Sequence, residues 1–239
     1  MSDSRLRLRG SVEVRHLFSS GEASTKTYDN TATDWARNVL AQLIMTVANG
    51  ESTSTTQSRP LYIALGTGTG SASHTDLAMF QETYNTRKAI SYTSAFQAFV
   101  AQFTTNYQTT DPNGTFTEAG LWDGPVVNLS LASATAVGAT SISLSGSTPA
   151  VYGVPVAGQA TRLYINDATN PEYALLAQTY NAGVTTWTLQ KGLTYAHASA
   201  TPVVVFSGNL WAHVVFGGAG ETKGTGEALT VQWSVYLDA

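Results

Sequence analysis

The clearest pattern in the chain is an alternation of apolar and polar residues near its C-terminal end, in the segment ALTVQWSVYL (228–237). One face of the strand that it predicts carries Leu229, Val231, Trp233, Val235 and Leu237. The other face carries Thr230, Gln232, Ser234 and Tyr236. Because successive side chains of a strand point to opposite faces, we expect a half-buried antiparallel strand here.

Similar alternation predicts further strands in the first and last parts of the chain. The segments are 6–18 (LRLRGSVEVRHLF), 22–28, 61–65, 115–122 and 209–216 (NLWAHVVF). Residues 87–103 are rich in β-branched and aromatic side chains, and they predict one bent strand or two strands. Residues 76–83 predict a short helix.

A longer helix is predicted after residue 29. Its candidate N-caps are Asp29, Asn30, Thr31 and Thr33. An apolar stripe at helical spacing follows, formed by Trp35, Val39, Leu40, Leu43, Ile44 and Val47. The pair Asn49-Gly50 is typical of a helix end.

Residues 126–205 differ in composition from the rest of the chain. Their charged residues are Arg162, Asp167, Glu172 and Lys191. Short apolar runs between Gly, Ala, Ser and Thr predict strands at 141–144, 161–165, 173–179 and 185–190. Asn181-Ala182-Gly183 predicts a hairpin turn between the last two. This segment therefore reads as a small all-β module.

The strands that flank this module fit together without it. One ends at GLWDG (120–124), and the next begins at GNLW (208–211). Sequential antiparallel strands usually lie side by side, and hairpin tips tolerate insertions. We therefore predict a mainly β chain. An antiparallel β-sandwich-like host domain with one α-helix (1–125 and 206–239) would carry a small inserted all-β module (126–205).

Charged residues make up only 12% of the 239 residues, and the net charge is −4. This balance disfavours a nucleic-acid partner, because such binding relies on Lys and Arg at phosphates. The basic cluster Arg5, Arg7, Arg9 and Arg15 fits one solvated strand face. The chain has no cysteine for disulfides or thiolate metal sites. It also lacks a membrane-spanning apolar run and a signal-peptide pattern, so we expect synthesis in a cytoplasm and no membrane partner.

Two loops share features with ligand-binding motifs. The loop GTGTG (66–70) follows a strand, but it lacks the Gly-Lys-Ser/Thr of a P-loop and the third glycine of a dinucleotide site. The loop NDATN (166–170) lacks the glycine and the bidentate glutamate of a calcium loop. The four histidines, His16, His74, His197 and His213, show no local metal-binding spacing. We predict no cofactor and no metal.

Glu82 and Glu118 are the carboxylates considered for glycosidase chemistry, which requires two such groups flanking a glycosidic bond. No sequence feature places them within reach of each other. The simpler interpretation is that Glu118 accepts hydrogen bonds from buried backbone or pairs with an arginine. Because the chain also lacks a nucleophile elbow, we predict a non-enzymatic protein without catalytic residues.

Aromatic side chains are the candidates for a ligand or interface surface. In a segment with few charges they fit an interface or a sugar-stacking surface, and they equally fit the core of a small β module. The candidates are Trp122, Tyr152, Tyr164, Trp187, Tyr195 and Trp211.

Four segments, PLYIALGTGTG, TEAGLWDG, GNLWAHVVF and ETKGTGEALTVQWSVYL, resemble a recurrent pattern in virion proteins of tailed bacteriophages. The segment TYDNTATDWARNVLAQLI resembles the helical entry of those proteins, and residues 126–205 resemble small β modules of tail and baseplate proteins. The resemblance implies a structural protein of the tail, baseplate or fibre region, located in the virion. It further implies homo-trimers or hexamers and other virion structural proteins as partners.

Three other interpretations stay open at this point. The chain fits a capsid decoration or head-fibre protein, because heads and tails use the same kinds of β surface. Residues 126–205 also fit a receptor-binding module that recognises a host-surface glycan through its aromatic side chains. A tail polysaccharide depolymerase that uses Glu82 and Glu118 is the third alternative, by analogy with other tail proteins.

Overall fold

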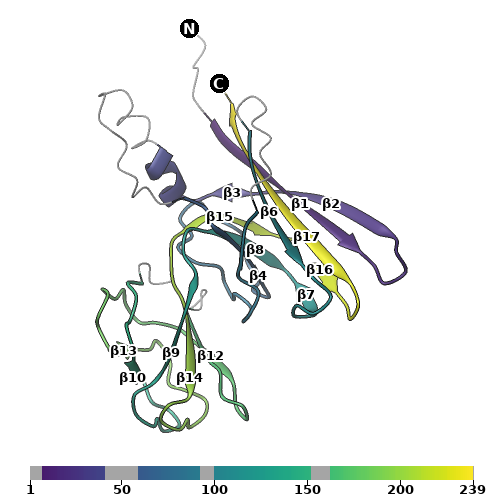
Figure 1. The fold of residues 1–239 in the computed structure, drawn as a ribbon. Coiled ribbons are helices and arrows are strands. Elements are labelled where there is room, and N and C mark those ends of the chain that lie inside the picture. Colours follow the sequence, from purple (N-terminus) through teal and green to yellow (C-terminus); the bar gives the residue numbers. More distant parts are fainter. Residues whose placement is uncertain (1–6, 41–58, 92–99, 152–161, 239) are drawn as a thin grey trace.

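The computed structural model describes residues 7–40, 59–91, 100–151 and 162–238 of the chain. The described residues are mainly β, with one α-helix over residues 34–40. Two antiparallel sheets form a β-sandwich-like unit, and a separate six-stranded sheet is built from residues 126–206 (Figure 1). The predicted fold class is therefore confirmed, whereas the division into two domains stays a prediction.

The first sheet of the sandwich has the strand order β2-β1-β17-β6. Its strands are β1 (Arg7–Leu17), β2 (Ala23–Asp29), β6 (Val100–Tyr107) and β17 (Ala228–Asp238). Strands β1 and β17 pair over their whole length, from Arg7 opposite Asp238 to Leu17 opposite Ala228. The alternation in β17 is confirmed, because Leu229, Val231 and Trp233 are completely buried.

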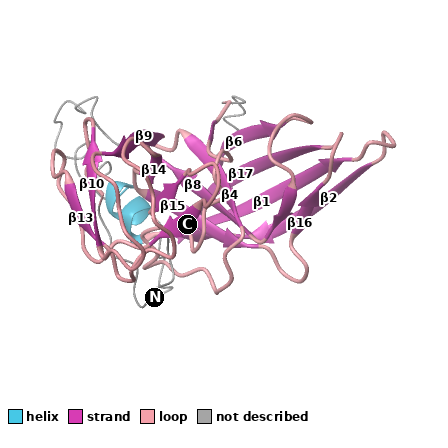
Figure 2. Cartoon of the chain, turned by 90° about the horizontal axis from the view of Figure 1, so that it is seen from below, coloured by secondary structure: helices cyan, strands magenta, loops and turns pink. Residues whose placement is uncertain are grey.

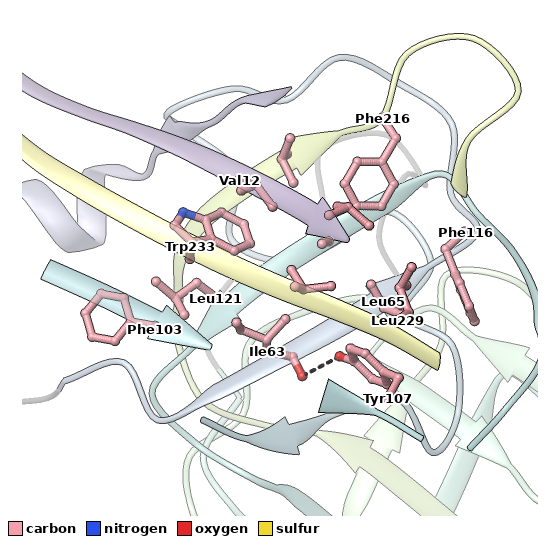
Figure 3. Close-up of a cluster of buried hydrophobic side chains, with 14 of the residues drawn as sticks. Val12, Ile63, Leu65, Phe103, Tyr107, Phe116, Leu121, Phe216, Leu229 and Trp233 are labelled. Carbon is pink, nitrogen blue, oxygen red and sulfur yellow. Dashed lines mark hydrogen bonds between the residues drawn. The ribbon is translucent and has the colours of Figure 1, made fainter. Parts of the chain in front are cut away.

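The second sheet has the order β3-β15-β8-β4-β5. Its strands are β3 (Thr31–Ala32), β4 (Tyr62–Gly66), β5 (Lys88–Ala89), β8 (Glu118–Trp122) and β15 (Leu210–Val215). A two-stranded ribbon, β7 (Gly114–Phe116) with β16 (Glu221–Lys223), accompanies them. The core lies between the two large sheets, where Val12, Phe103 and Trp233 meet Ile63 and Leu121 (Figure 3).

The single strand predicted at 115–122 is wrong, because β7 and β8 belong to different sheets. Thr117 separates them, and its backbone N–H donates to Gly66 O at 2.8 Å while its hydroxyl donates to Gly68 O at 2.6 Å. All five residues of β8 are buried, so this strand shows no alternation of exposure. It lies in the middle of its sheet, between β15 and β4.

The predicted longer helix begins after Thr33, whose hydroxyl accepts the N–H of Ala36 at 3.4 Å as an N-cap. Within the predicted stripe, Trp35 is 38% exposed and does not face the core. The stripe positions Leu43, Ile44 and Val47 lie outside the described residues. The helix predicted at 76–83 is wrong, because the backbone N–H groups of Phe80 and Gln81 donate to the Glu118 carboxylate instead.

The six-stranded sheet has the order β12-β11-β14-β9-β10-β13. Its strands are β9 (Val126–Leu131), β10 (Ser141–Ser145), β11 (Leu163–Ile165), β12 (Glu172–Ala174), β13 (Thr186–Thr188) and β14 (Pro202–Phe206). It has its own hydrophobic cluster, which includes Leu131, Ile142 and Trp187. In Figure 2 its strands β9, β10 and β13 lie at one end of the molecule, and β2 lies at the other.

Candidate functional site at the junction with residues 126–206

Residues 126–206 leave and re-enter the sandwich at the ends of two neighbouring strands. Strands β8 and β15 pair antiparallel, with Trp122 opposite Leu210 at the end of the ladder. The chain leaves after the first and returns before the second. The predicted hairpin relationship between these strands is therefore confirmed.

A short clamp holds the two crossing segments together. Asp123 accepts the backbone N–H of Asn209 at 2.6 Å and its side-chain amide at 2.9 Å. Gly124 and Gly208 approach so closely that a Cβ at Gly208 would lie 2.8 Å from the nitrogen of Gly124. Gly208 also has a φ of +84°, a conformation that glycine adopts without strain.

The guanidinium of Arg87 binds both crossing segments. Its Nη1 donates to Gly124 O at 2.9 Å and to Ser207 O at 2.5 Å. The remaining nitrogens Nε and Nη2 hold the Glu82 carboxylate at 2.8 and 2.5 Å, and both side chains are 1% exposed. Burial raises the pKa of Glu82, while the ion pair with Arg87 acts in the opposite direction. Such a planar, bidentate pair fixes orientation as well as distance.

Arg162, which belongs to the inserted segment, also bonds backbone carbonyls across the junction. Its guanidinium donates to the carbonyls of Phe206 at 2.9 Å and Leu77 at 2.6 Å, and the side chain is buried. The guanidinium carbons of Arg87 and Arg162 lie 4.0 and 5.3 Å from the centroid of the Trp122 ring. Both guanidinium groups therefore lie near the Trp122 ring, an arrangement that cation–π attraction favours.

Tyrosine rings extend this junction along one side. Tyr84 stacks on Tyr164 with centroids 4.8 Å apart, and Tyr164 contacts Tyr173 at the same centroid distance. The Tyr173 hydroxyl accepts the backbone N–H of Tyr84 at 3.1 Å. Asn166 donates to the Tyr84 hydroxyl at 3.3 Å. Residues 162–206 are thus fastened to the loop that carries Tyr84.

At the opposite end of β8 from the junction, Glu118 is saturated with hydrogen bonds. Its Oε1 accepts the N–H groups of Gly68 at 3.0 Å and Gln81 at 2.7 Å. Its Oε2 accepts the N–H of Phe80 at 3.0 Å and faces Nε2 of His213 at 2.8 Å. This arrangement confirms the interpretation that Glu118 binds buried backbone groups.

His213 connects this carboxylate to a second one. Its Nδ1 lies 2.7 Å from Oδ2 of Asp76, and its side chain is 0% exposed. Burial lowers the pKa of His213, but the hydrogen bonds to Asp76 and Glu118 outweigh it and raise the pKa above its ordinary value. Asp76, His213 and Glu118 together form an array of hydrogen bonds. This array ties the 67–81 segment to β8 and β15.

A similar array lies inside residues 126–206. His197 has a fully buried side chain, and its Nδ1 lies 3.0 Å from Asp167 while its Nε2 lies 2.8 Å from Glu172. The hydrogen bond to His197, together with the N–H groups of Thr169 and Asn170, lowers the pKa of Asp167 to about 2. Each large part of the chain thus contains one histidine bracketed by an aspartate and a glutamate.

The structure separates the six predicted aromatic residues. Trp122 and Trp187 are buried in hydrophobic clusters, which favours the core over a ligand surface for both. Trp211 packs partly buried against the sandwich core, and Tyr164 lies in the tyrosine stack. Tyr195 is 41% exposed, and Tyr152 lies outside the described residues.

The other motifs have structural explanations. In the GTGTG loop, a Cβ at Gly68 would lie 2.3 Å from Cβ of Phe80, so glycine is needed there for close packing. Glu82 and Glu118 are both buried and already bonded, which leaves neither carboxylate open to a substrate. Within the described ranges, no three His, Cys, Asp or Glu side chains are arranged to hold a metal ion. The helix found among the described residues is too short to cross a membrane.

Sequence reasoning missed several junction residues. Arg87, Asp123 and Arg162 were not singled out, although Arg162 is one of the few charges in 126–205 and such an isolated cation is a usable signal. Asp76 was not singled out either, because its partner is His213, from a distant strand. His74 itself pairs at 3.0 Å with Asp34.

The fold and this junction define a mainly β chain in which a six-stranded unit is fastened to one end of a sandwich. Comparison with protein-family models, with curated proteins and with solved structures finds no match.

Proposed function

We propose that the chain is a non-enzymatic structural component of a phage particle, associated with the tail, baseplate or fibre. In this role the sandwich binds neighbouring copies and other virion proteins, and the six-stranded unit projects from the particle. The family resemblance of the sequence supports the phage assignment. The observation that carries the structural role is the junction, where Arg87 holds both crossing segments against the buried Glu82.

The junction supports a projecting role because it fixes the direction of the unit. A flexible tether would need no buried guanidinium groups, whereas Arg87 and Arg162 are both buried and bonded across the junction. A repeated assembly would then display the unit at regular positions, and many weak contacts of linked copies add up to strong binding.

The test of self-assembly is the mass of the purified chain by light scattering after size exclusion. The chain has a mass of 25.3 kDa. The proposal predicts a stable trimer or hexamer, with masses at the corresponding multiples. A monomer at all accessible concentrations, both alone and with its neighbouring virion proteins, would contradict the proposal.

A second candidate function is recognition of a host-surface glycan by residues 126–206. Tyr195 favours it, because its ring is 41% exposed while its backbone N–H is held at 3.1 Å by the Glu172 carboxylate. An exposed aromatic ring offers an apolar face on which a sugar can stack. A glycan array would test it: wild-type protein should bind host-surface glycans, and Tyr195→Ala should lose that binding. No binding to any host glycan would contradict it.

A further inference from the structure

His213 lies between two carboxylate oxygens that already accept other protons. Oδ2 of Asp76 accepts the backbone N–H of Ser73 at 2.8 Å, and Oε2 of Glu118 accepts that of Phe80 at 3.0 Å. Both ring nitrogens of His213 therefore face acceptors, and both must donate for the array to be satisfied. Only the imidazolium form carries two N–H donors.

The other groups around His213 do not replace these partners. The Phe80 ring lies 5.0 Å away between centroids, and the neighbouring strand β3 places Thr31 opposite His213. Glu82 is neutralised by Arg87, with Arg162 nearby. His74 lies in the same loop as Asp76, but it pairs with Asp34, and both of these side chains are about half exposed. Asp76 and Glu118 are thus the carboxylates that His213 contacts.

The array also reaches the junction. Asp76 is followed by Leu77, whose carbonyl accepts the guanidinium of Arg162 at 2.6 Å. The Glu118 carboxylate holds the N–H groups of Gly68, Phe80 and Gln81. Any loosening of the array therefore affects the 67–81 segment at several points, including the carbonyl on which Arg162 rests.

We propose that His213, held between Asp76 and Glu118, is a pH-sensitive latch that fastens the 67–81 segment and thereby the seat of Arg162. When His213 loses its proton, one ring nitrogen presents a lone pair to a carboxylate oxygen, and one of the two hydrogen bonds is lost. This inference goes beyond the proposed function and does not depend on a phage particle.

The direction of the effect follows from the raised pKa of His213. A group whose pKa is higher in the folded state stabilises that state fully below its unfolded pKa. The contribution is lost as the pH rises through the folded pKa. The latch is therefore closed below the ordinary pKa of histidine, and it opens as the pH rises through the raised pKa of His213.

Hydrogen exchange of backbone amides in the full chain tests the latch. Exchange is compared with the intrinsic rate at each pH, and the His213 ring nitrogens are followed in parallel by NMR. We expect protection of Gly68, Phe80 and Gln81 to fall at least tenfold with the same midpoint as the His213 titration. Protection of Val12 and Trp233, in the other sheet of the sandwich, should not change with this midpoint.

Two variants sharpen the test. His213→Gln should show low, pH-independent protection of the 67–81 segment, whereas His197→Gln, which alters the similar array in the inserted segment, should leave that protection as in wild type. Should His213→Gln fail to fold, the wild-type titration alone decides. The latch is wrong if protection stays constant while His213 titrates, or if the pKa of His213 in the folded chain is not above the ordinary pKa of histidine. These readouts concern a single chain, so they are independent of whether the protein assembles.

Discussion

Nε2 of His213 lies 2.8 Å from Oε2 of Glu118, and neither side chain is exposed to solvent. The two residues are 95 positions apart in the chain, and they meet because β8 and β15 are neighbours in one sheet. The 67–81 segment that they hold also supplies the Leu77 carbonyl that accepts the guanidinium of Arg162. Loop packing and the seating of residues 126–206 thus depend on the same few side chains.

Replacing Glu118 by glutamine should destabilise the chain strongly. The variant removes a buried charge that accepts three backbone N–H groups and faces His213, so we expect a loss of about 3–5 kcal/mol. Urea unfolding followed by tryptophan fluorescence measures it. The control is Glu13→Gln on the exposed face of β1, which should change stability by less than about 0.5 kcal/mol. Equal stability of the two variants would contradict the saturated geometry of Glu118.

Gly68→Ala should destabilise by steric overlap alone. Its added Cβ would lie 2.3 Å from Cβ of Phe80 and 2.5 Å from Oε1 of Glu118, and overpacking of this kind costs about 1–3 kcal/mol. Gly217→Ala is the matched control, because nothing lies within 4 Å of its Cβ. The unfolding midpoints of the two variants measure the difference in their stability. A Gly68→Ala variant as stable as the control would show that the loop does not pack as described.

Residues 126–206 should lose stability in acid through Asp167. Its pKa is lowered to about 2 in the folded chain, from 3.8. A depressed carboxylate stabilises the fold fully above its unfolded pKa, and this contribution disappears as the pH falls through the folded pKa. The stability gap between wild type and Asp167→Asn should therefore be largest above pH 5 and shrink towards pH 2. Urea unfolding at pH 6, 4 and 2 measures this gap, and a gap independent of pH would refute the assignment.

The sandwich should fold without residues 125–207. Joining Gly124 directly to Gly208 creates a two-residue Gly-Gly loop between Asp123 and Asn209, a favoured hairpin connection. We expect a cooperative unfolding transition and dispersed NMR signals for the shortened chain, with some loss of stability because the contacts of Arg162 disappear. An unfolded or aggregated product would mean that the two parts of the chain form a single folding unit, contrary to the predicted domain division.

The sequence predicted the alternating strands well and the buried network poorly. The alternate spacing of Leu229, Val231 and Trp233 predicts that these side chains share one face of a strand. The capping oxygen of Thr33 predicts where the helix begins. Strand β14 was missed because PVVVF is a nearly continuous apolar run without a clear period, and β9 was missed although Val127, Leu129 and Leu131 alternate with Asn128 and Ser130. The 76–83 segment was misjudged because a distant carboxylate, Glu118, captures its backbone N–H groups.

The junction was only partly predictable for a related reason. Local pattern located the hairpin tip at residues 120–124 and 208–211, since the flanking strands carry their own signals. The contacts of Arg87 with Gly124 and Ser207 depend on residues 37 and 120 positions away, respectively. No local rule specifies such partners, because they arise when the sheet order is already set.

Mass spectrometry of purified virions tests our proposal that the chain is a structural part of a phage particle. Particles should be taken from a lysate of cells that carry the encoding genome, and separated from free protein by a density gradient. We expect peptides from both 7–122 and 126–206 in the particle fraction, at a copy number that is a multiple of three. Abundant protein in the lysate with none in the particles would contradict it.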